Sequence, residues 1–302
     1  MIVVTGAAGF IGRNLYQKYK NNHKVLLVDF LDKFNFKVST KDKVMDPFCF
    51  LLKLQDKTFA EEIDLIFHQG ACSSTMTYDP SYMMKHNFHY SSKLLKKCLE
   101  SDIRLIYASS ASVYGDGPFK ESAHLAPKNV YANSKRLFDN YVESFLYNNK
   151  TQIVGLRYFN VYGPYEENKG NMASVACQFK KQIDERGVVK IFKNSQNYLR
   201  DFTFVQDIID INDYFLNNAQ LSGIFNAGTG EAHPFTDVVD IMAERYNFKL
   251  IEIDMPQELI SKYQTFTESD NQRLLSVAKY KKPFHSLREG IEKYFSYWEV
   301  NE

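Results

Sequence analysis

The sequence of 302 residues lacks a charge excess, because 37 basic and 36 acidic side chains leave a net charge of +1. A general nucleic-acid-binding protein would show a basic excess, so we expect no nucleic-acid partner. No apolar run approaches the roughly 18 residues that a membrane helix needs, so we expect no membrane partner. The opening MIVVTGAAGF lacks the basic head and long apolar stretch of a secretory signal, which predicts a cytoplasmic protein.

Cysteine is also scarce. Cys49, Cys72, Cys98 and Cys177 are scattered and form no CxxC pair. This spacing disfavours a disulfide framework or a zinc site, so we expect reduced thiols and no bound metal. The length suffices for one large domain or two modest ones that share a cleft.

Short apolar runs alternate with amphipathic stretches in the first half of the chain. Strands are predicted at 2–4, 24–29, 64–68, 104–108 and 152–158, and helices at 82–99 and 131–145. This alternation predicts an α/β fold, a Rossmann-type doubly wound parallel sheet with helices on both faces. Binding and catalytic groups are then expected at the carboxyl ends of the strands.

After about Pro164 the alternation weakens, which predicts a smaller C-terminal substrate-binding lobe. We place the Rossmann domain at 1–164, rejoined by about 200–230, and the lobe at 165–199 and 231–302. Short strands are predicted at 190–192 and 249–253, with returns to the sheet around 202–205 and 224–228.

A glycine-rich turn follows the first predicted strand and opens a helix. Gly6, Gly9 and Gly12 have GxxGxxG spacing, and Asp29 ends the second predicted strand. Glycine permits a sharp turn and close approach of the backbone to a pyrophosphate, whose charge the helix N-terminus meets. Three glycines alone also fit an ordinary tight turn, but their combination with the acidic residue predicts dinucleotide binding.

The residues leave the choice of dinucleotide open. Asp29 is placed to bond both ribose hydroxyls, which favours NAD, whereas a nearby cation would favour the 2′-phosphate of NADP. The candidate cations are Lys33, Lys37 and Lys53, and each also fits an ordinary surface lysine.

Tyr131 and Lys135 form a YxxxK pair on one face of a predicted helix. An ammonium near a phenol lowers the phenol pKa from about 10, which makes the tyrosine usable as a base near neutral pH. Ser110 ends a strand upstream, where a serine can hydrogen-bond the same substrate hydroxyl. With the glycine-rich turn, these residues predict redox chemistry at a sugar hydroxyl.

Segments throughout the chain resemble the extended short-chain dehydrogenase/reductases and, within them, the ADP-glyceromanno-heptose 6-epimerases. TGAAGFIG (5–12), YASSASVYG (107–115) and VYANSK (130–135) are general to the superfamily. HQGACSST (68–75), KGNMASVA (169–176) and YQTFT (263–267) are more specific to the epimerases. The other matching segments are YMM (82–84), RYFNVYGP (157–164), RDFTFVQD (200–207) and SGIFNAGTG (222–230).

The resemblance implies inversion of ADP-D-glycero-β-D-manno-heptose at C6″ through a transient 6″-ketone, which supplies heptose for the lipopolysaccharide inner core. It implies an NADP cofactor, with NAD as the alternative, and a homo-oligomer that is a pentamer. It makes Tyr131 and Lys169 the two acid/base groups, with Ser110 orienting the reacting oxygen and Lys135 binding the nicotinamide ribose. Without the resemblance, Lys169 in the polar loop EENKGN would be an ordinary surface lysine.

The resemblance also implies binding positions. The cofactor contacts are Gly6, Gly9, Phe10, Ile11, Gly12, Asp29, Phe30, Lys53, Gln69, Gly70, Ala71, Cys72, Ser73, Asn87, Lys135, Val161 and Lys169. The substrate contacts are Ser110, Asn160, Asn171, Gln178, Phe192, Lys193, Asn194, Ser195, Arg200 and Tyr263. The guanidinium of Arg200 suits a phosphate, and an ion pair with Asp201 or Asp207 is the alternative.

The sequence departs from the family at three places. Asn171 replaces a frequent serine, Gln178 replaces a histidine, and residues 30–55 diverge where the family reads the NADP phosphate. These departures bear on the heptose contacts and on the cofactor preference.

Three other functions are compatible with this fold class. A 4,6-dehydratase needs an acid and a base beside the serine, where Ala111 and Ser112 stand, so it is disfavoured. A nucleotide-sugar 4-epimerase needs only serine, tyrosine and lysine, and Lys169 argues against it. A non-catalytic NADP-sensing Rossmann module is disfavoured by the intact catalytic residues.

Overall fold

The computed structural model describes residues 1–74, 79–257 and 264–301. Seven parallel strands form its central sheet, in the order β11-β6-β5-β4-β1-β2-β3. They are β1 (Ile2–Thr5), β2 (Val25–Val28), β3 (Lys43–Met45), β4 (Leu65–His68), β5 (Arg104–Ser110), β6 (Ile153–Tyr158) and β11 (Gly223–Ala227). The strand order reverses between β1 and β4, which is the switch point of a doubly wound sheet and confirms the predicted Rossmann-type fold.

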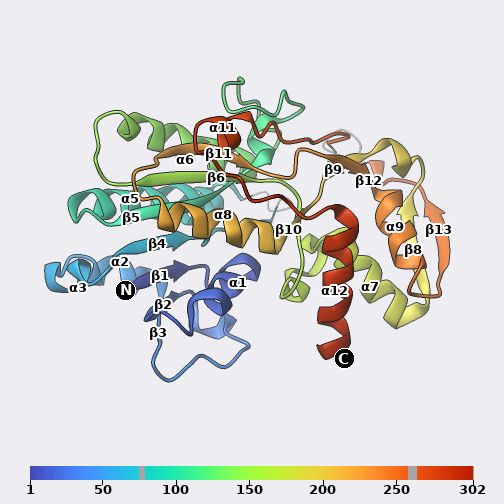
Figure 1. Cartoon of the computed structure of the whole chain (residues 1–302), viewed down its shortest axis with the longest axis horizontal. Helices are drawn as coiled ribbons and strands as arrows, with labels where there is room; N and C mark the ends of the chain where they lie inside the picture. The colour runs from blue at the N-terminus through green and yellow to red at the C-terminus, as the bar shows by residue number, and fades with distance from the viewer. Residues whose placement is uncertain (75–78, 258–263, 302) are drawn as a thin grey trace.

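Helices cover both faces of this sheet (Figure 1). One face packs against α1 (Phe10–Tyr19), α8 (Val205–Asn217) and α11 (Gln272–Ser276). The other packs against α2 (Pro47–Lys53), α3 (Lys57–Glu61), α5 (Tyr90–Glu100) and α6 (Val130–Leu146). Successive strand residues point to opposite faces, so Val4 joins the first core and Val3 the second. Continuous apolar runs such as IVV are therefore what a doubly covered sheet needs.

A smaller lobe lies beside the sheet domain (Figure 1). Its core packs α7 (Val175–Arg186), α9 (Phe235–Ala243) and α12 (Leu287–Asn301) around β8 (Val188–Phe192), which pairs in parallel with β13 (Lys249–Ile253). Two short strand pairs complete the structure: β7 (Val161–Tyr162) with β10 (Thr203–Phe204), and β9 (Leu199–Asp201) with β12 (Ala232–Pro234).

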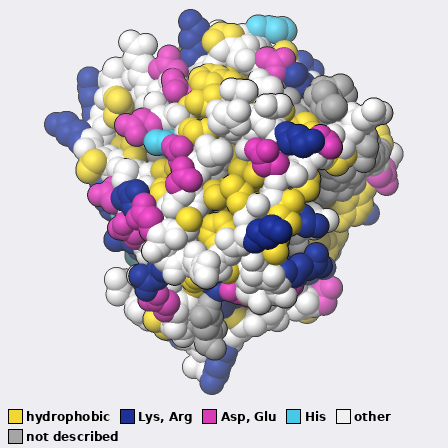
Figure 2. Space-filling view, turned by 90° about the vertical axis from the view of Figure 1, so that its right-hand side faces the viewer, with side chains coloured by type: hydrophobic (Ala, Val, Ile, Leu, Met, Phe, Trp, Pro, Cys, Tyr) yellow, Lys and Arg dark blue, Asp and Glu magenta, His cyan; other side chains and the backbone are white. Residues whose placement is uncertain are grey.

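The remaining helical turns are short. They are α4 (Pro80–Met83), the π-helical η2 (Met84–His89) and the 3-10 turns η1 (Leu31–Lys33), η3 (Ala111–Tyr114), η4 (Glu167–Met172) and η5 (Ser195–Asn197). Within the three described ranges, no helix combines the length and apolar character that crossing a membrane requires. The side of the smaller lobe shows apolar side chains between scattered basic and acidic ones, with neither charge dominant (Figure 2).

The structure differs from the predicted elements in several ways. β3 and α2 were not predicted, because the polar segment around them carries little apolar periodicity. The prediction that the chain returns to the central sheet around 202–205 was wrong, since β10 pairs with β7 outside that sheet. Leu274 and Tyr280 pack into a core beneath the sheet, although the predicted lobe spans 231–302.

A buried ion pair links α6 to the strands beneath it. Arg157 donates from Nε to Oδ2 of Asp139 at 2.9 Å, and the two side chains are 1% and 0% exposed. The hydroxyls of Tyr107 and Ser109 also donate to Asp139, each at 2.9 Å, and Arg157 Nη1 donates to the Tyr114 oxygen at 2.9 Å. Removing one partner would leave a charge buried without compensation.

We predict that Arg157→Met lowers the free energy of unfolding by about 3–5 kcal/mol, because the buried Asp139 carboxylate loses the cation that donates a hydrogen bond to it. Urea denaturation measures the loss. The matched control is Arg288→Met, which removes the exposed pair with Glu244 and should cost much less, because water screens an ion pair at the surface. Equal losses in the two variants would contradict a special role for the buried pair.

Candidate active site

A cavity of about 860 Å³ lies at the carboxyl ends of the sheet strands and extends to the smaller lobe. Ser110, Tyr131, Lys135 and Lys169, the four predicted catalytic residues, all line it. So do the predicted cofactor contacts Gly6, Gly9, Phe10, Ile11, Gly12, Asp29, Phe30, Gln69, Gly70, Ala71, Cys72, Ser73 and Val161. Of the predicted substrate contacts, Asn160, Asn171 and Arg200 also line the cavity.

Other predicted contacts are not on this wall: Lys53, Asn87, Gln178, Phe192, Lys193, Asn194 and Ser195. The Lys53 ammonium instead pairs with Asp56 at 2.6 Å, because both lie at the α2–α3 junction. Tyr263 lies outside the described residues.

Asn87 and Gln178 support the wall from behind. Asn87 exchanges two hydrogen bonds with the backbone of Cys72, at 2.8 and 3.0 Å, and so holds the loop that lines the cavity. Gln178 donates to the carbonyl of Ala173 at 2.7 Å. Both side chains therefore shape the cavity through its loops.

The glycine-rich turn brings two chain segments into close contact. A Cβ at Gly6 would lie 2.6 Å from the Gly70 nitrogen, and one at Gly12 would lie 2.1 Å from the Gly6 oxygen. Gly9, the N-cap of α1, offers no side-chain cap, so the first amides of the helix are not capped by that residue. This arrangement fits the pyrophosphate of a dinucleotide.

The acid at the end of β2 and a buried amide complete this half of the cavity. Asp29 accepts from the backbone N–H of Ala8 at 3.0 Å and of Phe30 at 2.9 Å; burial raises the pKa of its carboxyl, and these two bonds lower it. Lys33 also lines the cavity. Nε2 of Gln69 is buried without a partner among the described residues, as expected of a donor that awaits a ligand. These features fit a nicotinamide dinucleotide.

The predicted catalytic residues meet where β5 ends against α6. Nζ of Lys135 donates to the Ala108 carbonyl at 2.7 Å and lies 6.0 Å from the centre of the Tyr131 ring. Burial lowers the pKa of Lys135 to about 8, and Asp139 raises it. Ser110 accepts from the hydroxyl of Ser112 at 2.9 Å, so a second serine stands where a dehydratase would carry an acid.

The phenol of Tyr131 differs from expectation. The sequence predicts a pKa lowered by Lys135, but burial raises the pKa of Tyr131, and a hydrogen bond with Ser110 is what lowers it. The reason is the direction of the lysine, whose ammonium points to a backbone carbonyl.

Lys169 lines the cavity from η4, an element separate from the α6 helix that carries Tyr131 and Lys135. Its Nζ lies 5.0 Å from the centre of the Phe10 ring, at the start of α1. Burial lowers the pKa of Lys169, and the carboxylate of Glu166 raises it. The Tyr131 phenol and the Lys169 amine thus line one cavity from two separate elements.

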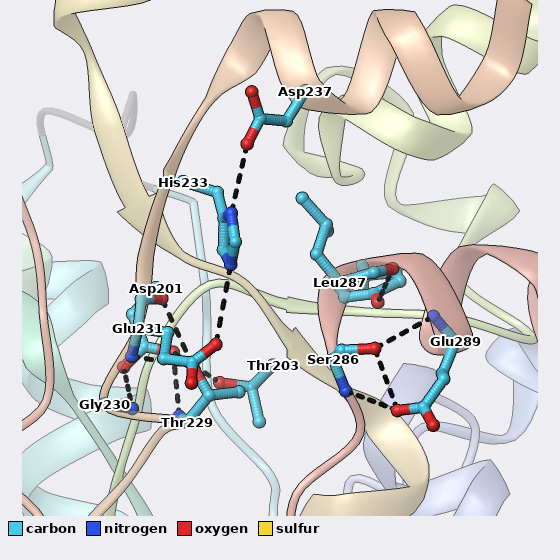
Figure 3. Close-up of polar contacts among 11 residues, drawn as sticks. Asp201, Thr203, Thr229, Gly230, Glu231, His233, Asp237, Ser286, Leu287 and Glu289 are labelled. Atoms are coloured by element: carbon cyan, nitrogen blue, oxygen red, sulfur yellow. Dashed lines mark hydrogen bonds and ion pairs between the residues drawn. The ribbon is translucent and has the colours of Figure 1, made fainter.

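Arg200 lines the cavity from β9, and its neighbour Asp201 fixes the adjoining loop. The buried Asp201 carboxylate accepts from the N–H and hydroxyl of Thr229 at 2.8 and 2.7 Å (Figure 3). Asp207 is bonded to His285 at 2.6 Å. Both carboxylates offered by the sequence as ion-pair partners of Arg200 are thus engaged by other groups.

Some wall residues were not found from the sequence: Pro47, Phe48, Tyr82, His86, Asn129, Tyr158, Phe202, Phe235, Gln264 and Thr267. The Phe48 and His86 rings surround Phe30 with centres 6.2–6.4 Å apart. Their scattered positions gave no signal. Thr267 donates to Asn160 at 3.0 Å and belongs to the segment YQTFT, whose specificity was the available signal.

This fold and site define a class of protein. The family model described as the NAD-dependent epimerase/dehydratase family matches residues 2–228. The chain belongs to this family.

Individual relatives narrow the comparison. The ADP-L-glycero-D-manno-heptose-6-epimerase of Brachyspira hyodysenteriae is 43% identical, over 97% of this chain and 96% of that protein. The crystal structure of the Helicobacter pylori ADP-L-glycero-D-manno-heptose-6-epimerase is similar with a TM-score of 0.84 and 31% identity, covering 99% of this chain and 96% of that one. A UDP-N-acetylglucosamine 4-epimerase from Methanobrevibacter ruminantium has a TM-score of 0.86 at 23% identity, over 100% and 98% of the chains, which shows the shared fold alone.

We predict that Gly12→Ala lowers the free energy of unfolding by about 1–3 kcal/mol, because the new methyl group meets the backbone oxygen of Gly6. Thermal unfolding and the amount of nucleotide retained on purification measure the effect. Gly9→Ala is the control, since its Cβ would lie 3.2 Å from the same oxygen and needs a smaller adjustment. A wild-type melting temperature in Gly12→Ala would contradict the close contact.

Proposed function

We propose that the protein inverts C6″ of ADP-D-glycero-β-D-manno-heptose to give the L-glycero isomer, for the supply of lipopolysaccharide heptose. The observation that carries this proposal is a single cavity lined by Ser110 from β5, by Tyr131 and Lys135 from α6, and by Lys169 from η4. The relative with 43% identity, which is named for the same activity, supports it.

The chemistry of C6″ requires such a site. No carbonyl neighbours this carbon, so its hydrogen is not acidic and simple deprotonation fails. A nicotinamide cofactor held by the glycine-rich turn, Asp29 and Lys135 would supply the chemistry needed, acceptance of a hydride from C6″ and its return to the other face of the 6″-ketone. The sugar hydroxyl meanwhile gives its proton to one protein group, and the turned ketone receives a proton from another. Net redox change is zero.

Tyr131 and Lys169 are the proposed proton carriers, because they reach the cavity from different elements. Burial favours the neutral form of Lys169, which a proton acceptor needs. Ser110, which hydrogen-bonds Tyr131, would orient the reacting oxygen. Lys135, anchored on the Ala108 carbonyl, would bind the nicotinamide ribose.

The proposed substrate contacts share polar chemistry. Arg200 would bind a phosphate of ADP, with Asn160 and Asn171 toward the sugar. The roles of Gln178, residues 192–195 and Tyr263 stay predictions of the resemblance. So do the cytoplasmic location and the homo-oligomer; the pentamer can be tested by light scattering.

We predict that Tyr131→Phe and Lys169→Met each lower turnover by about 10²-fold or more, because each removes one proton carrier. NMR of the product from ADP-D-glycero-β-D-manno-heptose, without added oxidant, measures turnover, and circular dichroism checks folding. Near-normal activity in Lys169→Met would end the two-carrier proposal. Epimerisation of a UDP-hexose at C4, with C6″ unchanged, would instead support the rival 4-epimerase.

The proposed cofactor is NADP, and the cation on the cavity wall supports this preference. Lys33 lines the cavity in the segment that follows Asp29 and has a loose contact with Asp32 at 3.9 Å. Lys53 is not on this wall and pairs with Asp56 at 2.6 Å. Asp29 is the feature that favours NAD. The preference for NADP over NAD therefore depends on the balance between Lys33 and Asp29.

We predict that Lys33→Ala weakens NADP binding about ten-fold or more, with little effect on NAD, since a contact between charged groups is lost. Titration of nucleotide-free protein with each dinucleotide measures both affinities. Lys53→Ala is the informative comparison. A selective loss of NADP affinity in Lys53→Ala but not in Lys33→Ala would restore the assignment made from the sequence.

A further inference from the structure

The loop that carries Lys169 is closed by one buried carboxylate. Glu166 is 0% exposed and lies between β7 and α7. Its Oε1 accepts from the Gly163 N–H at 3.0 Å and from the Ser174 hydroxyl at 2.7 Å, and its Oε2 accepts from the Ser174 N–H at 2.6 Å. The carboxylate thus joins the residue after β7 to the N-cap of α7.

Lys169 lies on the loop that Glu166 closes. Its N–H donates to the backbone carbonyl of Glu166 at 2.9 Å, which forms the first turn of η4. The chain then reverses at Gly170, whose φ of +54° favours glycine, and Ala173 donates to the Gly170 carbonyl at 3.1 Å. The side chain of Lys169 is directed to the cavity wall, where it faces Phe10.

The two charges also act on each other. Burial raises the pKa of the Glu166 carboxyl, and the positive charge of Lys169 is the largest influence that lowers it. In return, Glu166 and, from α7, Cys177 raise the pKa of Lys169, which burial lowers.

Three further ionisable groups face Glu166 or Cys177. Burial raises the pKa of Tyr162 on β7 and of Tyr294 on α12 well above their ordinary value, so both phenols are neutral. Glu167 is exposed on the same loop and acts on Cys177 and Tyr294. Glu166 is therefore the fully buried acidic group next to the amine.

We infer that Glu166 is the positioning residue for Lys169: its carboxylate holds the loop that presents this amine to the substrate. The inference rests on the proposed role of Lys169 as a proton carrier. It goes further by assigning a task to a side chain that is absent from the cavity wall.

The variant Glu166→Gln tests this because it keeps the side-chain size and removes the charge, and its amide nitrogen can no longer accept a hydrogen bond as a carboxylate oxygen does. We expect kcat to fall about ten- to hundred-fold with KM little changed, since misplacement of a reacting group has effects of this size. One inflection of the activity–pH profile should move to lower pH by about one unit, because a charge that raises the pKa of Lys169 is gone. Glu167→Gln is the matched control and should leave the profile in place.

A lower kcat with an unmoved profile in Glu166→Gln would overturn the inference, because a merely structural role has that effect. The same shift in Glu167→Gln would also overturn it. If Glu166→Gln does not fold, Glu166→Asp replaces it. The shorter carboxylate should leave the inflection in place and lower kcat about ten-fold, and a wild-type kcat would contradict the positioning role.

The parallel measurement on Lys169→Met distinguishes failure of the Glu166 inference from failure of the proposed function. Loss of activity in Lys169→Met together with an unchanged pH profile in Glu166→Gln refutes the inference alone. Retained activity in Lys169→Met refutes the proposed function, and the inference falls with it.

Discussion

The site depends on the buried ion pair between Arg157 and Asp139. Asp139 lies one helical turn after Lys135 on α6, and the strand residues Tyr107 and Ser109 both donate to it. The pair therefore fixes the helix that carries the tyrosine and the lysine against the strand that ends in Ser110. Two charges enclosed in this way cannot separate at low cost, so the relative placement of these catalytic groups is rigid.

Buried carboxylates also fix two other loops near the cavity. Glu166 closes the loop that carries Lys169, and Asp201 gathers the loop after β11 beside Arg200. Each carboxylate is fully buried and accepts several hydrogen bonds from segments that the sheet does not connect. Three enclosed carboxylates thus place three groups of side chains around one cavity, while the glycine-rich turn supplies the dinucleotide end.

The sequence predicted the residues that line the cavity better than the buried carboxylates that hold those residues in place. Tyr131 and Lys135 share a helical face by spacing, and Ser110 ends a strand, so parallel-sheet topology alone brings them together. Asp139, Glu166 and Asp201 escaped because an acidic residue reads the same whether solvated or enclosed, and the donors that enclose them can be distant, as with Thr229, 28 residues beyond Asp201. β3 escaped because its pairing with β2 comes from the sheet and not from an apolar pattern.

The central claim is that C6″ is inverted by oxidation and return of the same hydrogen, with Tyr131 and Lys169 handling only the proton of the oxygen. Epimerisation of ADP-D-glycero-β-D-manno-heptose in D₂O, followed by NMR and mass spectrometry of the product, tests it most directly. We expect an L-glycero product with no carbon-bound deuterium at C6″. Deuterium at that carbon would contradict it, because the hydrogen would then have exchanged with water.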